Sequence, residues 1–201
     1  KTINGKDNAN YPPSANNASK TALTWRKYLD EQYANGIWNT NACPIVIRYA
    51  EVLLTYAEAV NELSGPSADV YDKLDLIRGR VGMPKVDREK YASKETLRRL
   101  IRRERGVELA GEGVRRADIL RWKDDNGKMV AETVLNGVLE RVVGTVNYAE
   151  TDPTKRAEID TNAPATDKKI EDRVFKVHNR YNPIPQGAID NNPNLEQNPG
   201  Y

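Results

Sequence analysis

The sequence is poor in the residues that carry most metal and thiol chemistry. Its 201 residues include one cysteine, Cys43, and one histidine, His178. A lone cysteine excludes an internal disulfide and a cysteine-based zinc site, and a lone histidine excludes a multi-histidine metal site. A Cys43–His178 catalytic pair would need two residues far apart in the chain to meet, so we interpret Cys43 as a small apolar residue packed beside Pro44. We therefore expect no metal and no cofactor.

A large net charge and a long apolar run are also lacking. The 31 Lys and Arg residues against 29 Asp and Glu residues give a formal net charge of +2. This balance excludes an acidic tail protein and a globally basic nucleic-acid binder. No run approaches the roughly 20 apolar residues of a membrane-spanning helix. The chain begins at Lys1 without a signal-like segment, which suggests a processed chain or a fragment.

The strongest predicted element is a helix over Ile45–Leu63, opened by Pro44 in its first turn and ended by Gly65-Pro66. Apolar residues are nearly continuous there. The polar residues recur at spacings of three and four and form one narrow stripe, which comprises Arg48, Glu51, Thr55, Glu58 and Glu62. We therefore expect this helix to be buried over most of its surface.

A second helix is predicted from about Ser67 to Val81. Its apolar face is marked by residues spaced four, three and four apart, namely Val70, Leu74, Ile77 and Val81. With the first helix it would form an αα-hairpin, about as long as a tetratricopeptide repeat.

A third helix is predicted from Ser93 to about Ala110, and a short fourth from Val114 to about Trp122. Glu104 and Glu108 continue the apolar side of the third helix, where a carboxylate needs a partner. We predict that both are buried in structural ion pairs with arginines of the same helix or with Arg78 or Arg115.

The remaining segments indicate little regular structure. Residues 1–22 and 151–169 are expected to be loops, whereas the β-branched segments 138–143 and 174–177 could form a two-stranded ribbon. From Asn182 on, Asn-Pro occurs three times, so we expect an extended tail. The predicted fold is mainly α, with tetratricopeptide-like hairpins, long loops, a small β-ribbon and an extended C-terminal tail. Its regions are a helical core at about 45–122, loop and ribbon at about 123–181, and the tail at 182–201.

The sequence contains few motifs that are typical of catalysis or ligand binding. No nucleophile elbow, Walker loop or dinucleotide fingerprint is present, and Glu51 and Glu58 lie on one side of one helix, where they cannot easily flank a sugar. We therefore predict no catalytic residues and no enzyme. The Arg-rich stretch 97–105 is interleaved with acids, which favours internal ion pairs over nucleic-acid binding. The aromatic residues before the first helix either pack against it, which we favour, or stack on sugar rings, in which case Trp25, Tyr33 and Trp38 are the candidate ligand-binding residues.

Four motifs in order resemble those of the SusD-like (RagB/SusD) outer-membrane nutrient-binding lipoproteins of Bacteroidetes. Residues 48–62 resemble the signature RYAEVLLxYAEAxNE, and residues 77–84 resemble IRxRAGxP. Residues 102–122 resemble RRERRxELAxEGxRxxDLRRW, although Gly111, Val114 and Arg116-Ala117 depart from that pattern, and residues 183–201 resemble IPQxEIxxNPNLxQNPGY.

The resemblance implies the C-terminal portion of a non-enzymatic, surface-exposed lipoprotein of the outer membrane. Such a protein would bind oligosaccharides or other nutrients and deliver them to a SusC-like TonB-dependent transporter, with an upstream lipid anchor as its only membrane attachment and no nucleic-acid partner. Most sugar-stacking aromatics of that family lie upstream of the first helix, and none can be matched to a residue here. The alternative from the residues alone is a helical-repeat scaffold that binds a protein partner and no sugar.

Overall fold

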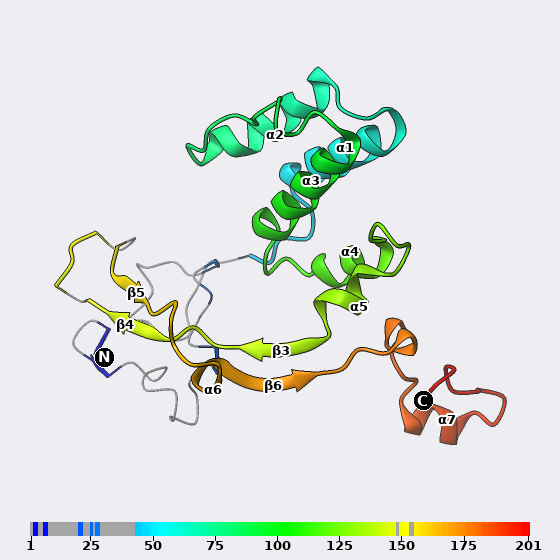
Figure 1. Ribbon diagram of the computed structural model, residues 1–201. Coiled ribbons are helices and arrows are strands. Elements are labelled where there is room, and N and C mark those ends of the chain that lie inside the picture. Colours follow the sequence, from blue (N-terminus) through cyan, green and yellow to red (C-terminus); the bar gives the residue numbers. More distant parts are fainter. Residues whose placement is uncertain are drawn as a thin grey trace. The chain divides into compact units, whose positions relative to one another are not determined.

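The structure is a computed structural model that describes residues 2–3, 6–7, 20–21, 25, 27–28, 43–147, 149–152 and 155–201 (Figure 1). The chain divides into two compact units, which comprise residues 26–118 and residues 1–25 with 119–201. Within the described residues, no helix combines the length and the apolar character needed to cross a membrane.

The first unit contains the helices α1 (Tyr49–Ser64), α2 (Ala68–Arg80) and α3 (Lys94–Glu108), and α1 lies against both of the others (Figure 1). The predicted αα-hairpin is confirmed. Gly65 ends α1 with a positive φ of 79°, which glycine adopts without strain. The Ser67 side chain then caps α2 by accepting a hydrogen bond from the Val70 N–H. Ser93 and Thr96 form a capping box at the start of α3.

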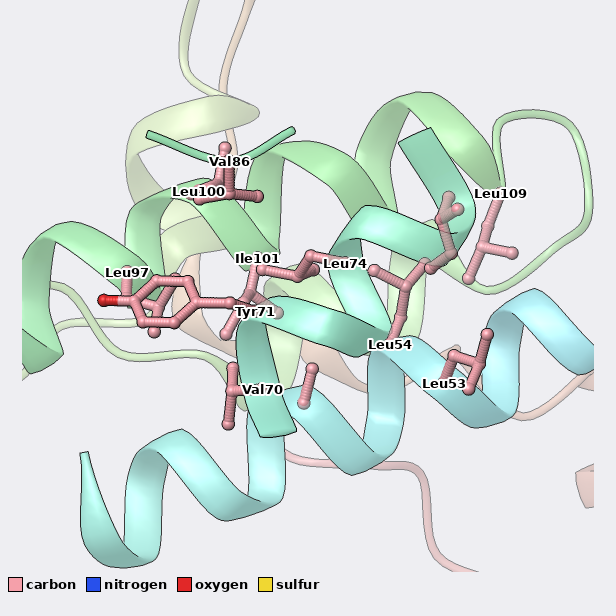
Figure 2. Packing of buried hydrophobic residues seen from close by; sticks show 12 residues of the cluster. Leu53, Leu54, Val70, Tyr71, Leu74, Val86, Leu97, Leu100, Ile101 and Leu109 are labelled. Carbon is pink, nitrogen blue, oxygen red and sulfur yellow. The ribbon is translucent and has the colours of Figure 1, made fainter. Parts of the chain in front are cut away.

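The core of this unit lies where the three helices meet (Figure 2). The predicted face of α2 is confirmed for Val70, Leu74 and Ile77, which are buried, whereas Val81 lies beyond the helix and is exposed. The other buried core residues are Leu53, Leu54, Ala57, Tyr71, Val86, Leu97, Leu100, Ile101 and Leu109. The core therefore combines one face of each helix with the segment that joins α2 to α3.

Two predictions about α1 are wrong. The helix begins at Tyr49, and Arg48 before it is extended with a φ of −139°. The β-branched run Ile45–Ile47 explains the late start, because such residues favour extended backbone. The helix is also not buried over most of its surface, since Tyr49 is 71% exposed and Leu63 is 85% exposed. Its polar stripe lies beside the arginines of α3, with Thr55 and Glu62 still exposed, and part of its apolar surface faces outward.

The second unit has short elements. α4 (Arg115–Arg121) ends within it, and β3 pairs antiparallel with β6, β4 with β5, and β1 with β2. The bounds of the others are α5 (Val130–Val134), β3 (Gly137–Glu140), β4 (Gly144–Val146), β5 (Ala157–Ile159), α6 (Ala165–Lys168), β6 (Lys169–Arg173), η2 (Val177–Arg180), α7 (Gln186–Asn191), β1 (Thr2–Ile3) and β2 (Lys6–Asp7). A small core forms around Ile119, Met129 and Ala131.

Several boundaries in this unit differ from the sequence prediction. The ribbon exists, but β3 pairs with residues 169–173 and not with 174–177, because both faces of this ribbon are largely exposed and burial does not fix its register. The segment 151–169 contains β5 and α6, and residues 1–22 contain β1 and β2. The tail contains α7, which ends at Asn191, because Asn192 precedes Pro193 and is extended.

Candidate functional site

The polar stripe of α1 and the arginines of α3 face one another along an antiparallel pair of helices. Near the end of α1, Glu62 accepts hydrogen bonds of 2.5 and 2.7 Å from the Arg98 guanidinium. In the middle of the pair, Thr55 accepts a bond of 2.9 Å from Arg105. Just before α1, Arg48 lies 2.5 Å from a carboxylate oxygen of Glu108. These arginines are therefore engaged in ion pairs and hydrogen bonds within the unit.

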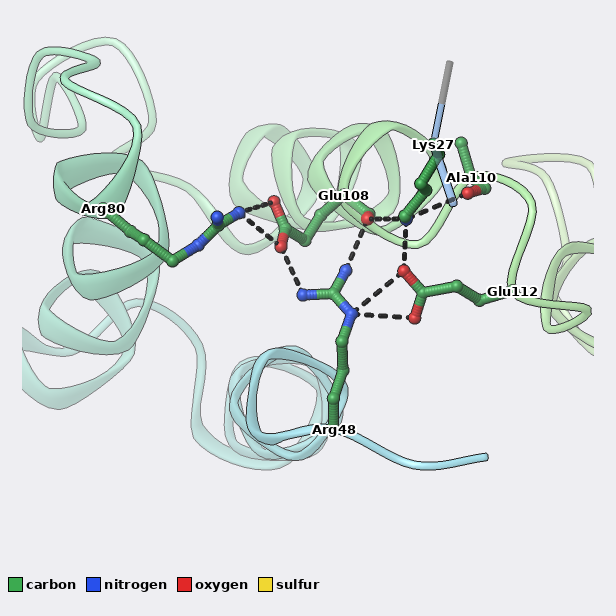
Figure 3. A network of polar contacts seen from close by, with 6 residues as sticks. All are labelled: Lys27, Arg48, Arg80, Glu108, Ala110 and Glu112. Carbon is green, nitrogen blue, oxygen red and sulfur yellow. Dashed lines mark hydrogen bonds and ion pairs between the residues drawn. The ribbon is translucent and has the colours of Figure 1, made fainter. Parts of the chain in front are cut away.

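A polar cluster surrounds Arg48, and we call Lys27, Arg48, Arg80, Glu108 and Glu112 the Arg48 network (Figure 3). Arg48 Nε donates to both carboxylate oxygens of Glu112, at 2.9 and 2.8 Å. Arg80 donates to the Glu108 carboxylate at 2.8 and 3.0 Å. Lys27 contacts the Glu112 carboxylate as well. Three cations thus converge on two carboxylates at the C-terminal end of α3.

The same cations satisfy backbone carbonyls that the helix leaves without partners. Arg48 Nη2 donates to the Glu108 carbonyl at 2.5 Å, and Lys27 Nζ donates to the carbonyls of Glu108 and Ala110 at 3.1 and 3.0 Å. Positive charge at a helix C-terminus also interacts favourably with the helix dipole. The Arg48 network therefore anchors the entry to α1 against the end of α3.

Hydrogen bonding in the network shifts the pKa values of its members. Burial raises the pKa of Glu112, but hydrogen bonds from Arg48 and Lys27 outweigh that effect, so the net pKa is lowered from 4.5. The hydrogen bond to Glu112 raises the pKa of Arg48 above its ordinary value. Both shifts favour the charged forms of Glu112 and Arg48.

A second, more buried cluster surrounds Arg105, whose side chain is 5% exposed. Arg105 Nε lies 2.9 Å from Asp118 Oδ2 and 4.0 Å from a carboxylate oxygen of Glu58. Sequence reasoning did not find this cluster. The available signal was the position of Thr55 and Glu58 on the polar stripe of a helix that otherwise looks buried.

Of the two carboxylates predicted to form ion pairs, Glu104 has a predicted partner and Glu108 has others. Glu104 lies 2.5 Å from Arg78, and both side chains are 13% exposed. Glu108 pairs with Arg48 and Arg80, neither of which was predicted as its partner. The Arg115 guanidinium packs over Gly106 of α3, where a β-carbon would lie 3.3 Å from Nη1.

The predicted ligand-binding aromatics are only partly described. Trp25 is 65% exposed. Tyr33 and Trp38 lie outside the described residues. The half-exposed Tyr28 lines a pocket of about 300 Å³ together with Cys43, Ile45 and Glu112. Cys43 is exposed, contrary to the expectation of a packed thiol, because the segment it belongs to does not join the helix. Among the described residues, no group of three or more His, Cys, Asp or Glu is placed to hold a metal.

The helical hairpin, the capped third helix and their ion-paired interface define a mainly helical, tetratricopeptide-like unit, and the chain also contains a small β-ribbon. The chain belongs to the SusD family, whose model matches residues 1–201. It is similar to SusD-like protein P25 of Formosa agariphila, with 40% identity over 79 residues that cover 39% of this chain and 15% of that protein. It is also similar to SusD-like protein P2 of the same organism, with 38% identity over 93 residues that cover 44% of this chain and 18% of that protein.

A solved SusD-like protein from Bacteroides fragilis has a similar fold, with a TM-score of 0.57 and 28% sequence identity. The match covers 79% of this chain and 26% of the solved one. The chain thus spans about a quarter of this solved relative and less of the curated relatives it matches.

Proposed function

We propose that this chain is part of a glycan-binding, surface-exposed lipoprotein of the outer membrane that delivers oligosaccharides or other nutrients to a SusC-like TonB-dependent transporter. The observation that carries the proposal is the family match over residues 1–201. The protein acts by binding and not by catalysis. Its partners are the oligosaccharide and the transporter, and it binds no nucleic acid.

The proposed binding mechanism is that of a lectin. An aromatic ring stacks on the apolar C–H face of a sugar, and polar side chains hydrogen-bond to the hydroxyl groups. Trp25 supports this role because its ring is largely exposed. Tyr33 and Trp38 remain proposed ligand-binding residues on the strength of the sequence alone.

Calorimetry of the full-length protein against a panel of oligosaccharides tests the proposal. Wild-type protein should bind at least one glycan saturably. Trp25→Ala should weaken that binding by at least about tenfold, since stacking on an aromatic ring and the removal of its apolar surface from water together contribute more than about 1.4 kcal/mol. Tyr49→Ala is the matched control, because it removes another exposed aromatic ring from a helix with no proposed role in sugar binding. If both variants bind the glycan as tightly as the wild-type protein does, Trp25 is not part of the site.

A protein-interaction scaffold is the second candidate, and the exposed face of α1 favours it. Tyr49, Val52, Tyr56, Ala59 and Leu63 are exposed and are spaced three, four, three and four residues apart. That spacing forms a continuous apolar stripe suited to a facing helix. Tight capture of the transporter without binding of any glycan, abolished by Val52→Asp, would favour the scaffold over the glycan-binding protein.

A further inference from the structure

A pocket of about 510 Å³ lies in the second unit, lined by the turn that follows α4 and by the segment of η2. This volume is within the range of about 300–1,000 Å³ that small-ligand sites occupy. Its apolar lining includes Leu120, Met129 and Val177, and Met129 is buried. Such a surface can receive the C–H groups of a ligand while polar groups around it fix the orientation.

The first wall of the pocket is a hydrogen-bonded turn that carries Lys128. Asp124 Oδ1 accepts the N–H groups of Asn126 and Lys128, both at 2.9 Å. The Asp124 N–H donates to the Lys128 carbonyl at 2.8 Å, and Lys123 forms a β-bridge with Met129. The backbone beneath the two lysines is therefore held before any ligand arrives.

The second wall of the pocket carries Arg180 and Tyr181, and contacts from Tyr201 hold this wall in place. The Tyr201 hydroxyl donates to the Tyr181 carbonyl at 2.8 Å, and its ring meets His178 edge to face with centroids 5.0 Å apart. Gly200 lets the chain come this close, since a β-carbon there would lie 2.7 Å from the His178 ring. Both walls are thus preorganised by contacts within the same unit.

The polar lining of the pocket is predominantly basic. Lys123, Lys128 and Arg180 line it together with one acid, Glu132, whose carboxylate accepts the Met129 N–H at 3.2 Å. Within the part of the chain that the structure describes, no carboxylate forms an ion pair with Lys128 or Arg180. The Arg180 guanidinium lies 4.6 Å from the centroid of the Tyr181 ring, which is 47% exposed. An anion entering the pocket would therefore meet Lys128 and Arg180 without having to displace a carboxylate of the described residues from either of them.

We infer that this pocket binds an acidic sugar unit, one that carries a sulfate or a carboxylate, within an oligosaccharide. A planar guanidinium can donate two parallel hydrogen bonds to either anion, and Lys128 adds a second charge from the opposite wall. The apolar lining and the exposed part of the Tyr181 ring would contact the sugar ring itself. This inference rests on the proposed function, and it adds the class of glycan and a site distinct from Trp25.

The test compares acidic and neutral forms of one oligosaccharide, the sulfated or uronic form and its uncharged counterpart, in calorimetry with the full-length protein. Wild-type protein should bind the acidic form at least about tenfold more tightly, because hydrogen bonds to charged groups are the stronger ones. Raising the NaCl concentration should reduce the difference. Lys128→Glu and Arg180→Glu should each abolish the preference. Lys155→Glu makes the same charge change at an exposed lysine outside the pocket and should keep it.

The outcomes separate this inference from the proposed function. Equal binding of both forms, or a preference for the acidic form that survives Lys128→Glu and Arg180→Glu, would overturn the inference and leave glycan binding standing. Binding of neither form, nor of any other glycan, would overturn the proposed function and the inference with it. Inorganic sulfate alone serves as a further probe, and its competition with the acidic oligosaccharide would support the anion contact.

Discussion

Replacing Arg105 with methionine should destabilise the first unit severely, because it removes the guanidinium from beside a buried carboxylate. Arg105 is 5% exposed and lies 2.9 Å from Asp118, whose side chain is 4% exposed. Breaking a buried pair by removing one partner costs about 3–5 kcal/mol, chiefly through the uncompensated charge that remains. Thr55 would lose a hydrogen bond at the same time, which adds to the loss. We therefore expect the free energy of unfolding to fall by about 3–5 kcal/mol.

Urea unfolding of the full-length protein, followed by far-ultraviolet circular dichroism, measures this change. Arg98→Met is the matched control, because Arg98 also lies on α3 but its pair with Glu62 is more exposed, and exposed pairs contribute about 1 kcal/mol or less. The double variant Arg105→Met/Asp118→Leu should recover part of the loss, since it removes the Asp118 carboxylate together with its cation and leaves only the more distant Glu58 carboxylate without its contact to Arg105. Equal, small effects of Arg105→Met and Arg98→Met would refute the argument, because they would show that Asp118 is solvated.

Three further predictions concern the network, the tail and a helix cap. Folding lowers the pKa of Glu112, so the ionised carboxylate stabilises the folded state fully above the unfolded pKa near 4.5, and this stabilisation is lost as the pH falls through the lower folded pKa. Glu112→Gln should therefore reduce the fall in the free energy of unfolding at acidic pH, when unfolding is measured against pH. Gly200→Ala should lower the melting temperature, because the new methyl meets His178 at a positive φ, whereas Gly187→Ala has open space and should not. Ser93→Ala should cost about 1 kcal/mol in urea unfolding through the lost cap, and an unchanged midpoint would contradict the capping role.

Helices with clear local signals could be predicted from the sequence. The boundaries of α2 follow from the Ser67 cap and the spacing of Val70, Leu74 and Ile77, and α3 follows from Ser93 and Thr96. The start of α1 could not be predicted, because proline favours a first helical turn while the β-branched run after it favours extended backbone. These two preferences oppose each other. In the structure, the Arg48 guanidinium contacts the carbonyl and the carboxylate of Glu108 at the end of α3.

Partners across elements were harder to predict than the elements themselves. Spacing placed Glu104 and Glu108 on the apolar side of α3 but could not show that Arg48 precedes α1 within reach of Glu108. Spacing likewise defines the polar stripe of α1 but does not show that this stripe lies beside the arginines of α3. Periodicity defines a face and does not say which neighbour covers it. For the ligand, sequence provides Trp25 as a candidate, while the basic pocket depends on residues brought together only by the fold.

The central claim is that the protein binds glycans, and titration calorimetry of the full-length protein tests it most directly. Titration with neutral and acidic oligosaccharides should give saturable heats for at least one glycan, with Trp25→Ala weakening the binding and Tyr49→Ala leaving it unchanged. The absence of binding to every glycan, in a protein that still captures its transporter, would contradict the claim and leave the helical scaffold as the function.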